Sequence, residues 1–527
     1  MMDATQGSPT PLVSLVIVCY NYGKYLLDAV ASAKAQTFRD LEILVVDGGS
    51  DDAQTIEVVE QLKDDPSLRV YRREKRCMAG DNRNYGIGLA AGKYICCLDA
   101  DDLLRPSYIE KAVMLTESLG VDIVSTSRSE FGGRGRVANL KFEPVLEDVL
   151  VENQMNTVSL FSRAIWQKAG GYDDFGLGTD HIHEDWHFWM KCMVAGARVY
   201  NLAYEGLFRY RVHAQESLSQ QRGQVPDLER QTAFVNEAYQ KLVQQGIVDC
   251  EPGRKEIEPE SGALESIAIR QRKGNTTAAM ILVPCFDLDT MERLVEPMAK
   301  MLSGKVERVV LVAMQRYEDR EDRLGLWLDR ISPYHYDYPR SFSKIDPAEF
   351  LRYLVRSHAI QTIHVVDDAA REAVSGLKAI HSELEILESD STELMKQFEA
   401  QLVSSSDQKD KGLIKLHIVC EGDRNPKSAG TEVWLLAIRN RDGYIIRSDL
   451  FRDVASEHWS IVDCDASPLG KALVASGPAS LDLELTEGST LQLLSHDWSG
   501  KAALEYGGKH ITVDLYSEVS TTKSINL

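Results

Sequence analysis

The sequence lacks any pair of cysteines with the two-residue spacing used by structural zinc sites and redox motifs. Its nine cysteines are scattered and odd in number, and several lie in apolar stretches, where cysteine behaves as a small hydrophobic residue. This pattern predicts a reducing compartment.

Long apolar runs are also missing. No window approaches the roughly 18 consecutive apolar residues of a membrane-spanning helix, so we predict no transmembrane segment. Residues 1–11 are polar, lack the apolar core of a signal peptide and are expected to form a disordered tail. We therefore expect a cytoplasmic protein, and peripheral association with the inner face of the membrane stays open.

Positive charge is scarce. With 59 Lys and Arg against 80 Asp and Glu, the formal net charge is −21, which argues against a nucleic-acid partner. A phosphorylated substrate is not excluded, because a bound divalent cation can bridge it to an acidic protein. The length of 527 residues predicts about three domains of ordinary soluble composition.

The N-terminal part alternates strand-like apolar runs with helical patterns over residues 12–127. This alternation is typical of βαβ units and predicts an α/β domain with a mostly parallel sheet. Right-handed crossovers place the carboxyl ends of such strands along one edge. Including a helix at about 228–245, we predict that this domain spans residues 12–245.

Two further domains are expected after a charged linker with proline and glycine at 246–275. Residues 276–405 read as a small Rossmann-like α/β domain without a glycine-rich loop, so phosphate binding there is unsupported. Residues 411–527 contain short strand-like runs separated by turn residues, which predicts an all-β sandwich. Aromatic residues of the sandwich either bind a glycan or, as is more common, belong to the core.

The segment Asp99–Asp102 carries the clearest chemical signal. Three carboxylates follow the apolar run Tyr94–Leu98, so a strand presents them at the carboxyl edge of the sheet, where open α/β sheets bind ligands. Hard oxygen ligands on a strand end suit Mg²⁺ or Mn²⁺, which also grips substrate phosphates. Taken alone, the same residues also fit an acidic turn or a helix N-cap.

Other polar segments occur at the ends or starts of predicted elements. Their order along the chain is Tyr20-Asn21, Asp47-Gly48-Gly49-Ser50, Arg83 within Gly80–Gly86, Glu184-Asp185 at a helix start, and His213 after Arg209–Val212. An arginine at a helix start suits bidentate phosphate contacts. We expect the first two segments and the aspartate cluster to meet at one edge.

These segments, in this order, make residues 12–215 resemble the family 2 glycosyltransferases, which have the GT-A fold. The resemblance implies transfer of a sugar from a nucleoside diphosphate sugar with inversion, using Mg²⁺ or Mn²⁺. It assigns donor binding to Tyr20 and Asn21, nucleobase binding to Asp47 (most often to uracil), and the ribose or base side to Asp99.

The resemblance also assigns Arg83 to the diphosphate, Asp101 to the metal, and Asp185 to the general base, with Glu184 beside it. His213 matches a late histidine that ligates the metal or touches the diphosphate in some members. The chemistry agrees, because inverting transfer needs a carboxylate to accept the acceptor proton and a cation to stabilise the leaving diphosphate. Gly48 stands where many members have a second aspartate, which bears on nucleotide preference.

Each assignment has a structural alternative. Asp47 also fits a turn cap, Glu184 and Asp185 fit acids that complement a helix dipole, and His213 fits a surface loop. His181, His183 and His187 suggest zinc, but a structural or substrate-lining role is favoured. Trp186 and Trp189 are expected in the core or in an acceptor-pocket wall.

We therefore predict an inverting, metal-dependent glycosyltransferase that favours a UDP-sugar and a glycan, lipid-linked or protein-linked acceptor. Two alternatives remain: a non-catalytic glycan-binding or scaffold protein with a relic GT-A domain, and a sugar nucleotidyltransferase. The 276–405 domain faintly resembles half of a GT-B fold, and no second active site is predicted there. The oligomeric state stays open.

Overall fold

The computed structural model divides the chain into two compact units. The first comprises Met1–Gly133, Val137–Lys273 and Ser341–Ser357, and the second comprises Arg134–Arg136, Gly274–Arg340 and His358–Leu527. The residues described are 10–131, 137–138, 140–175, 183–213, 225–247, 262–271, 276–287, 290–315, 325–366, 371, 374, 377, 381, 383–388, 413–420, 422–423, 425–439, 445–446, 458–464, 467, 471–496, 498–517 and 521–527.

The main sheet of the first unit has seven strands in the order β10-β6-β9-β4-β1-β2-β3. Only β9 runs antiparallel to its neighbours, so the predicted mostly parallel sheet is confirmed. The central strands consist mainly of apolar residues buried on both faces, as parallel strands covered by helices require. The strand bounds are β1 Val13–Cys19, β2 Leu41–Asp47, β3 Leu68–Arg72, β4 Tyr94–Asp99, β6 Ile123–Thr126, β9 Leu160–Ser162 and β10 Val199–Leu202.

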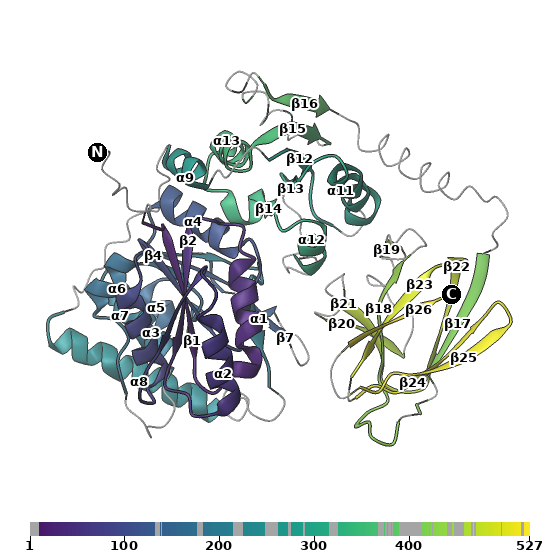
Figure 1. Ribbon diagram of the computed structural model, residues 1–527, viewed down its shortest axis with the longest axis horizontal. Helices are drawn as coiled ribbons and strands as arrows, with labels where there is room; N and C mark the ends of the chain where they lie inside the picture. Colours follow the sequence, from purple (N-terminus) through teal and green to yellow (C-terminus); the bar gives the residue numbers. More distant parts are fainter. Residues whose placement is uncertain are drawn as a thin grey trace. The chain divides into compact units, whose positions relative to one another are not determined.

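Helices cover both faces of this sheet, with α1 and α2 on one side and α3, α6 and α7 on the other (Figure 1). Trp186, Phe188 and Trp189 of α7 are buried in the core beside strand residues such as Phe161, so both tryptophans are core residues. The helix bounds are α1 Gly23–Lys34, α2 Ala53–Leu62, α3 Ala79–Leu89, α4 Tyr108–Leu119, α5 Leu146–Val149, α6 Arg163–Ala169, α7 Glu184–Val194, α8 Val225–Gln244 and α9 Ala263–Gln271.

A small second sheet in the first unit has the order β5-β11-β7-β8. Its strands are β5 Leu103–Leu104, β7 Arg128–Phe131, β8 Val137–Ala138 and β11 Phe208–Arg211. Strand β5 directly follows the aspartate cluster, and β11 pairs with it antiparallel. This pairing brings the chain after residue 208 back to the end of β4.

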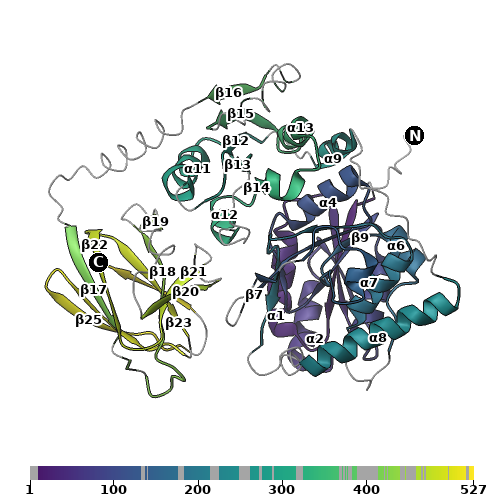
Figure 2. The same cartoon turned by 180° about the vertical axis from the view of Figure 1, so that it is seen from behind.

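The second unit begins with a five-stranded parallel sheet in the order β14-β13-β12-β15-β16. The bounds of its strands and of the helices along this part of the chain are β12 Ala278–Val283, η1 Met291–Val295, α11 Glu296–Ser303, β13 Arg308–Ala313, α12 Gly325–Ile331, β14 His335–Asp337, η2 Tyr338–Phe342, α13 Pro347–Ser357, β15 Ile360–Val365 and β16 Glu385–Glu388. Helix α11, which packs against β13, lies beside this sheet in the reverse view (Figure 2).

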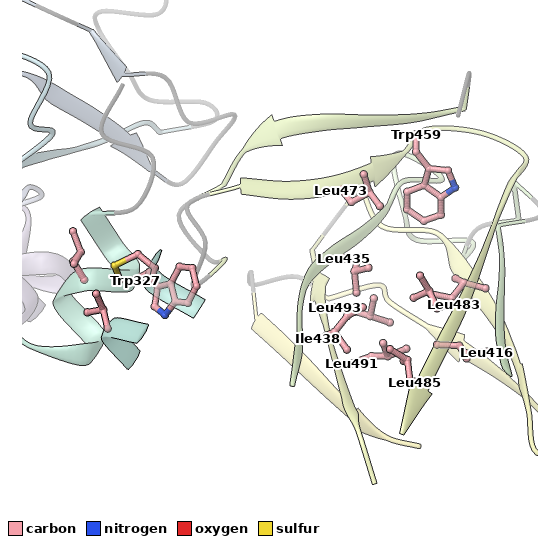
Figure 3. Close-up of a cluster of buried hydrophobic side chains, with 14 of the residues drawn as sticks. Trp327, Leu416, Leu435, Ile438, Trp459, Leu473, Leu483, Leu485, Leu491 and Leu493 are labelled. Atoms are coloured by element: carbon pink, nitrogen blue, oxygen red, sulfur yellow. The ribbon is translucent and has the colours of Figure 1, made fainter. Parts of the chain in front are cut away.

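The C-terminal strands form two antiparallel sheets, β22-β17-β24-β25 and β20-β21-β18-β23-β26, with β19 beside β18. Leucines from both sheets interdigitate between them, for example Leu435 and Leu493 from one and Leu416 and Leu483 from the other (Figure 3). The bounds are β17 Leu413–Cys420, β18 Val433–Arg439, β19 Ile445–Ile446, β20 Trp459–Asp463, β21 Lys471–Ala475, β22 Ala479–Thr486, β23 Thr490–Ser495, β24 Lys501–Tyr506, β25 Lys509–Asp514 and β26 Thr521–Asn526. The expected sandwich is therefore present.

The limits of the two compact units do not test the expected domain boundaries. Helix α9 lies inside the segment expected as a linker, and both it and residues 341–357 belong to the first unit. Domain limits at 245, 275 and 405 therefore stay predictions. Among the helices that the structure describes, none has both the length and the apolar character needed to cross a membrane.

Candidate functional site

The carboxyl ends of β2, β1 and β4 lie side by side at one edge of the main sheet. In the strand register, Cys19 of β1 faces Asp47 of β2, and Val18 faces Asp99 of β4. Asp47 and Asp99 therefore flank the end of β1, where Tyr20 and Asn21 follow. The expected convergence of these segments is present in the structure.

Asp47 organises the turn after β2. Its carboxylate accepts hydrogen bonds from the Ser50 backbone N–H at 3.2 Å, from Ser50 Oγ at 2.5 Å and from Arg72 Nε at 3.2 Å. Arg72 also donates to the Ser50 carbonyl at 2.9 Å. The Asp47 side chain is fully covered while that of Arg72 is 36% exposed, so Arg72 is the more accessible member of this pair.

Two glycines after Asp47 let the turn pack tightly. Gly49 adopts φ +81°, and a Cβ there would lie 2.4 Å from the Lys75 carbonyl carbon, so only glycine fits. A Cβ on Gly48 would approach Asn82 Nδ2 at 3.2 Å and Cys77 Sγ at 3.3 Å. A side chain at position 48 would therefore require these neighbours to shift by a few tenths of an ångström.

Tyr20 and Asn21 lie beside this turn. The Arg76 guanidinium lies 4.9 Å from the Tyr20 ring centroid, a cation–π distance. Asn21 has φ +55° and clamps the loop, since its Nδ2 donates to Asp51 Oδ1 at 2.6 Å and its Oδ1 accepts from the Asp51 N–H at 3.0 Å. Both residues are therefore at the site, and their contact with a donor stays a prediction.

Arg83 lies between two of the predicted carboxylates. Its side chain is 2% exposed, and it donates to Asp99 Oδ1 at 2.7 Å and to Glu184 Oε1. Burial raises the pKa of Asp99 while the charge of Arg83 opposes that rise. In this arrangement Arg83 orients the two acids, and a direct contact with a diphosphate requires that it exchange partners.

Asp185 lies in the first turn of α7, next to Glu184. Its Oδ2 accepts a hydrogen bond from Asn153 Nδ2 at 3.2 Å. Burial raises the pKa of the Asp185 carboxyl, and the neighbouring Glu184 charge raises it further, against His183 and Arg83. A carboxylate with a raised pKa accepts a proton more readily, which suits a general base.

Asp101 and His213 meet although 112 residues separate them. Asp101 Oδ2 lies 2.8 Å from His213 Nε2, and the other ring nitrogen lies 3.3 Å from the Tyr25 hydroxyl. Arg211 donates through Nε to the Asp101 carbonyl at 2.7 Å and through its backbone N–H to Asp102 Oδ1 at 2.8 Å. Strand β11 thus fixes both His213 and the aspartate cluster.

A divalent cation fits the Asp101–His213 pair by ligand type, because carboxylate oxygen and imidazole nitrogen both bind Mn²⁺. Within the described part of the chain, no three His, Cys, Asp or Glu side chains are grouped as a complete metal site. Two protein ligands agree with an ion that takes its other ligands from substrate phosphates and water.

Asp102, the residue after Asp101, is almost fully buried. Burial raises the pKa of Asp102 well above its usual range, and the charges of Asp101 and Asp99 add to the effect. The charges of Asp101 and Asp99 thus act with burial to disfavour the ionised form of Asp102.

The histidine group does not form a zinc site among the described residues. His187 is buried, its Nδ1 lies 3.1 Å from Asp173 Oδ2, and its ring packs against Phe175 and Phe234. His183 precedes α7, and His181 lies outside the described residues. The structural role favoured for His187 agrees with this packing.

Sequence reasoning named Arg211 only as part of the segment before His213, and it missed Arg72 and Asn153 as partners of the predicted acids and Tyr25 as a partner of His213. Arg211 lies two residues before His213 and was within reach of a motif analysis. The other three carry no local signal, because they contact their partners only through the sheet and its loops.

Known proteins share this domain. Residues 14–165 match the family described as Glycosyl transferase family 2, which confirms the resemblance predicted from the motifs. An uncharacterized glycosyltransferase of Haemophilus influenzae is 27% identical over 221 residues, covering 40% of this chain and 68% of the relative. Glycosyltransferase GlyG of Streptococcus pneumoniae is 34% identical over 113 residues, covering 21% of this chain and 38% of GlyG.

Solved structures are also similar. TarS of S. aureus, residues 1–349, is 22% identical with a TM-score of 0.34, and the match covers 38% of this chain and 60% of that one. A mannosyltransferase of Pyrobaculum calidifontis, solved with GDP-Man and Mn²⁺, is 20% identical with a TM-score of 0.31, covering 39% and 58%. The matched part of this chain thus spans about 60% of each solved chain.

Proposed function

We propose that this chain, whose residues 14–165 are a family 2 glycosyltransferase domain, transfers a sugar from a nucleoside diphosphate sugar to an acceptor hydroxyl with inversion. The favoured donor is a UDP-sugar, and the reaction depends on Mn²⁺ or Mg²⁺. The acceptor class is a glycan, free or linked to lipid or protein.

The observation that carries the proposal is the Asp101–His213 pair. The fold brings two side chains with metal-binding chemistry to 2.8 Å from each other, at the end of a strand whose last residue is Asp99. An acidic turn or a helix cap would not need a histidine from 112 residues away. A ligand site at the carboxyl edge of a parallel sheet explains the pairing.

The reaction follows from the positions of the acids. An acceptor hydroxyl oxygen bonds to the anomeric carbon, the bond from that carbon to the diphosphate oxygen breaks, and Asp185 takes the hydroxyl proton. Asn153 and Glu184 set the orientation and pKa of Asp185. A bound cation supplies the charge that stabilises the leaving diphosphate.

The donor side is formed by the turns after β1 and β2. Tyr20 and Asn21 follow β1 beside Asp47, and contact of Asp47 with a base requires that Arg72 move aside. Uracil fits this arrangement, because its N3–H donates to a carboxylate and its carbonyl oxygens accept from a guanidinium. The cytoplasmic location also belongs to the proposal and rests on composition.

Calorimetric titration of the full chain with UDP, GDP, dTDP and CDP, each with and without Mn²⁺, tests this function. We expect UDP to bind in the presence of Mn²⁺ and to lose most of its affinity in EDTA. Tight binding of another nucleotide would replace the UDP preference. If the folded protein binds none of the four, the domain is a relic and the scaffold alternative holds.

A further inference from the structure

The segment between β14 and β15 of the second sheet folds with the first compact unit. Residues Ser341–Ser357 belong to that unit, although the strands before and after them belong to the other. Helix α13 packs against α9, and α9 packs against α4 of the glycosyltransferase domain. A segment that lies more than 100 residues after β11, the last strand of this domain, thus packs with the domain.

Two buried polar contacts bind this segment to the domain. Tyr353 donates from its hydroxyl to Glu110 Oε1 at 3.1 Å, and Ser341 Oγ donates to Glu205 Oε1. Glu205 Oε2 is also paired with Lys111 Nζ. All five side chains are buried, so these hydrogen bonds satisfy polar groups that water does not reach.

Glu205 holds the turn that leads into β11. Its carbonyl accepts from Thr126 Oγ1 at 2.5 Å and from the Leu207 N–H at 2.8 Å. The Leu207 carbonyl then accepts from the Arg105 N–H at 2.9 Å, at the start of the β5–β11 ladder. The same strand ends at Arg211, and His213 follows two residues later.

We propose that Ser341 and Lys111, acting through Glu205, are positioning residues for Arg211 and His213 at the metal and diphosphate site. The role of those two residues rests on the proposed function. A buried carboxylate keeps one orientation when two donors hold it, and it turns toward water when one donor is lost. Loss of the Ser341 donor therefore loosens the turn at 203–207 and the strand that it feeds.

The test compares Ser341→Ala with Tyr353→Phe in the full chain. Both variants remove one buried hydroxyl from the same segment. Tyr353→Phe loses a contact with Glu110 of α4, and Ser341→Ala loses a contact with Glu205, which pairs with Lys111, the next residue of α4. We expect Ser341→Ala to weaken UDP binding in Mn²⁺ by roughly fivefold, as the loss of one hydrogen bond allows. Tyr353→Phe should leave the affinity within about twofold at a similar loss of thermal stability.

Hydrogen exchange of the Arg211 amide provides a readout that does not need a nucleotide. That N–H donates to Asp102, so we expect its protection to fall in Ser341→Ala and to stay unchanged in Tyr353→Phe. Ser341→Cys, which keeps a weak donor of similar size, should be intermediate. If Ser341→Ala does not fold, Ser341→Cys takes its place in the comparison with Tyr353→Phe.

The outcomes separate the two proposals. Equal Arg211 protection in all variants, or an equal loss in Ser341→Ala and Tyr353→Phe, overturns the positioning role. Wild-type protein that binds no nucleotide contradicts the proposed function, and the exchange measurement then still decides whether Ser341 positions β11.

Discussion

The chain contains two mainly parallel sheets with strands that end in aspartate, and among the residues that the structure describes only the first sheet gathers a candidate site. In the first, Asp47 ends β2 and Asp99 ends β4; in the second, Asp337 ends β14. Both sheets therefore offer a carboxyl edge of the kind that binds ligands in α/β proteins. The difference lies in the partners of these acids.

Besides the local contact of Asp47 with Ser50, the acids at the edge of the first sheet bind side chains from distant elements. Arg83 on α3 reaches Asp99, and His213 after β11 reaches Asp101. In the second sheet, Asp337 pairs with Arg340 three residues later, and Asp287 accepts from Thr290 at 2.9 Å, also three residues later. The carboxyl edge of a parallel sheet is thus not a site by itself, and a candidate site forms where several elements direct side chains to that edge.

The largest effect is expected from Asp185→Asn. Asparagine keeps the shape and the hydrogen bond from Asn153 but cannot accept the acceptor proton, so we expect kcat to fall by about 10²- to 10⁴-fold with donor affinity nearly unchanged. Steady-state kinetics and calorimetry on the same variant check this. A variant with wild-type kcat would remove Asp185 from the mechanism.

The wild-type pH profile sharpens the same prediction. Asp185 must be unprotonated to act as a base, and its pKa is raised by burial and by Glu184. We therefore expect kcat/KM to fall as the pH decreases, beginning at a higher pH than for an ordinary aspartate. In the Glu184→Gln variant this decline should begin at a lower pH, because the negative charge that raises the pKa of Asp185 is removed.

The variants Asp101→Ala and Asp337→Ala test the difference between the two sheets. Loss of the Asp101 ligand should reduce UDP affinity in Mn²⁺ by about 10- to 100-fold and remove the metal dependence. The Asp337 change, at a strand end outside the candidate site, should leave both unchanged. Equal affinities in wild type and Asp101→Ala would contradict the metal role.

Asp287→Ala should cost about 1 kcal/mol of stability in the second unit without changing transfer. Asp287 accepts from the Thr290 N–H at 3.0 Å, from Thr290 Oγ1, and from Cys285 Sγ at 2.9 Å, and these contacts fix the start of the following helix. Hydrogen exchange of the β12 and β13 amides measures the change. A simultaneous loss of activity would show that this edge also takes part in function.

The smallest effect is expected from Asp102→Asn. The raised pKa means that the folded state binds a proton more tightly than the unfolded state, so stability falls as the pH rises through the window above the ordinary pKa. Asparagine removes this cost and should raise the melting temperature slightly at pH 8 without metal. The difference should vanish at low pH, where Asp102 is protonated.

Much of the N-terminal fold was predictable because its signals are local. Apolar runs separated by helical patterns predict the parallel sheet, and aspartates directly after those runs predict which edge carries the candidate site. The pairing of Asp101 with His213 was predictable only through the family resemblance, since spacing says nothing about contacts across 112 residues. The sandwich followed from strand-like runs, whereas its sheet order did not.

The sequence by itself determined the element types, the strand ends that carry acids and the family of residues 14–165. Tertiary structure alone decided that Arg72 covers Asp47, that Arg83 lies between Asp99 and Glu184, and that residues 341–357 fold with the first unit. The reason is physical. Periodicity and turn chemistry act over a few residues, whereas a buried charge is satisfied by whichever partner the folded backbone brings within hydrogen-bond distance.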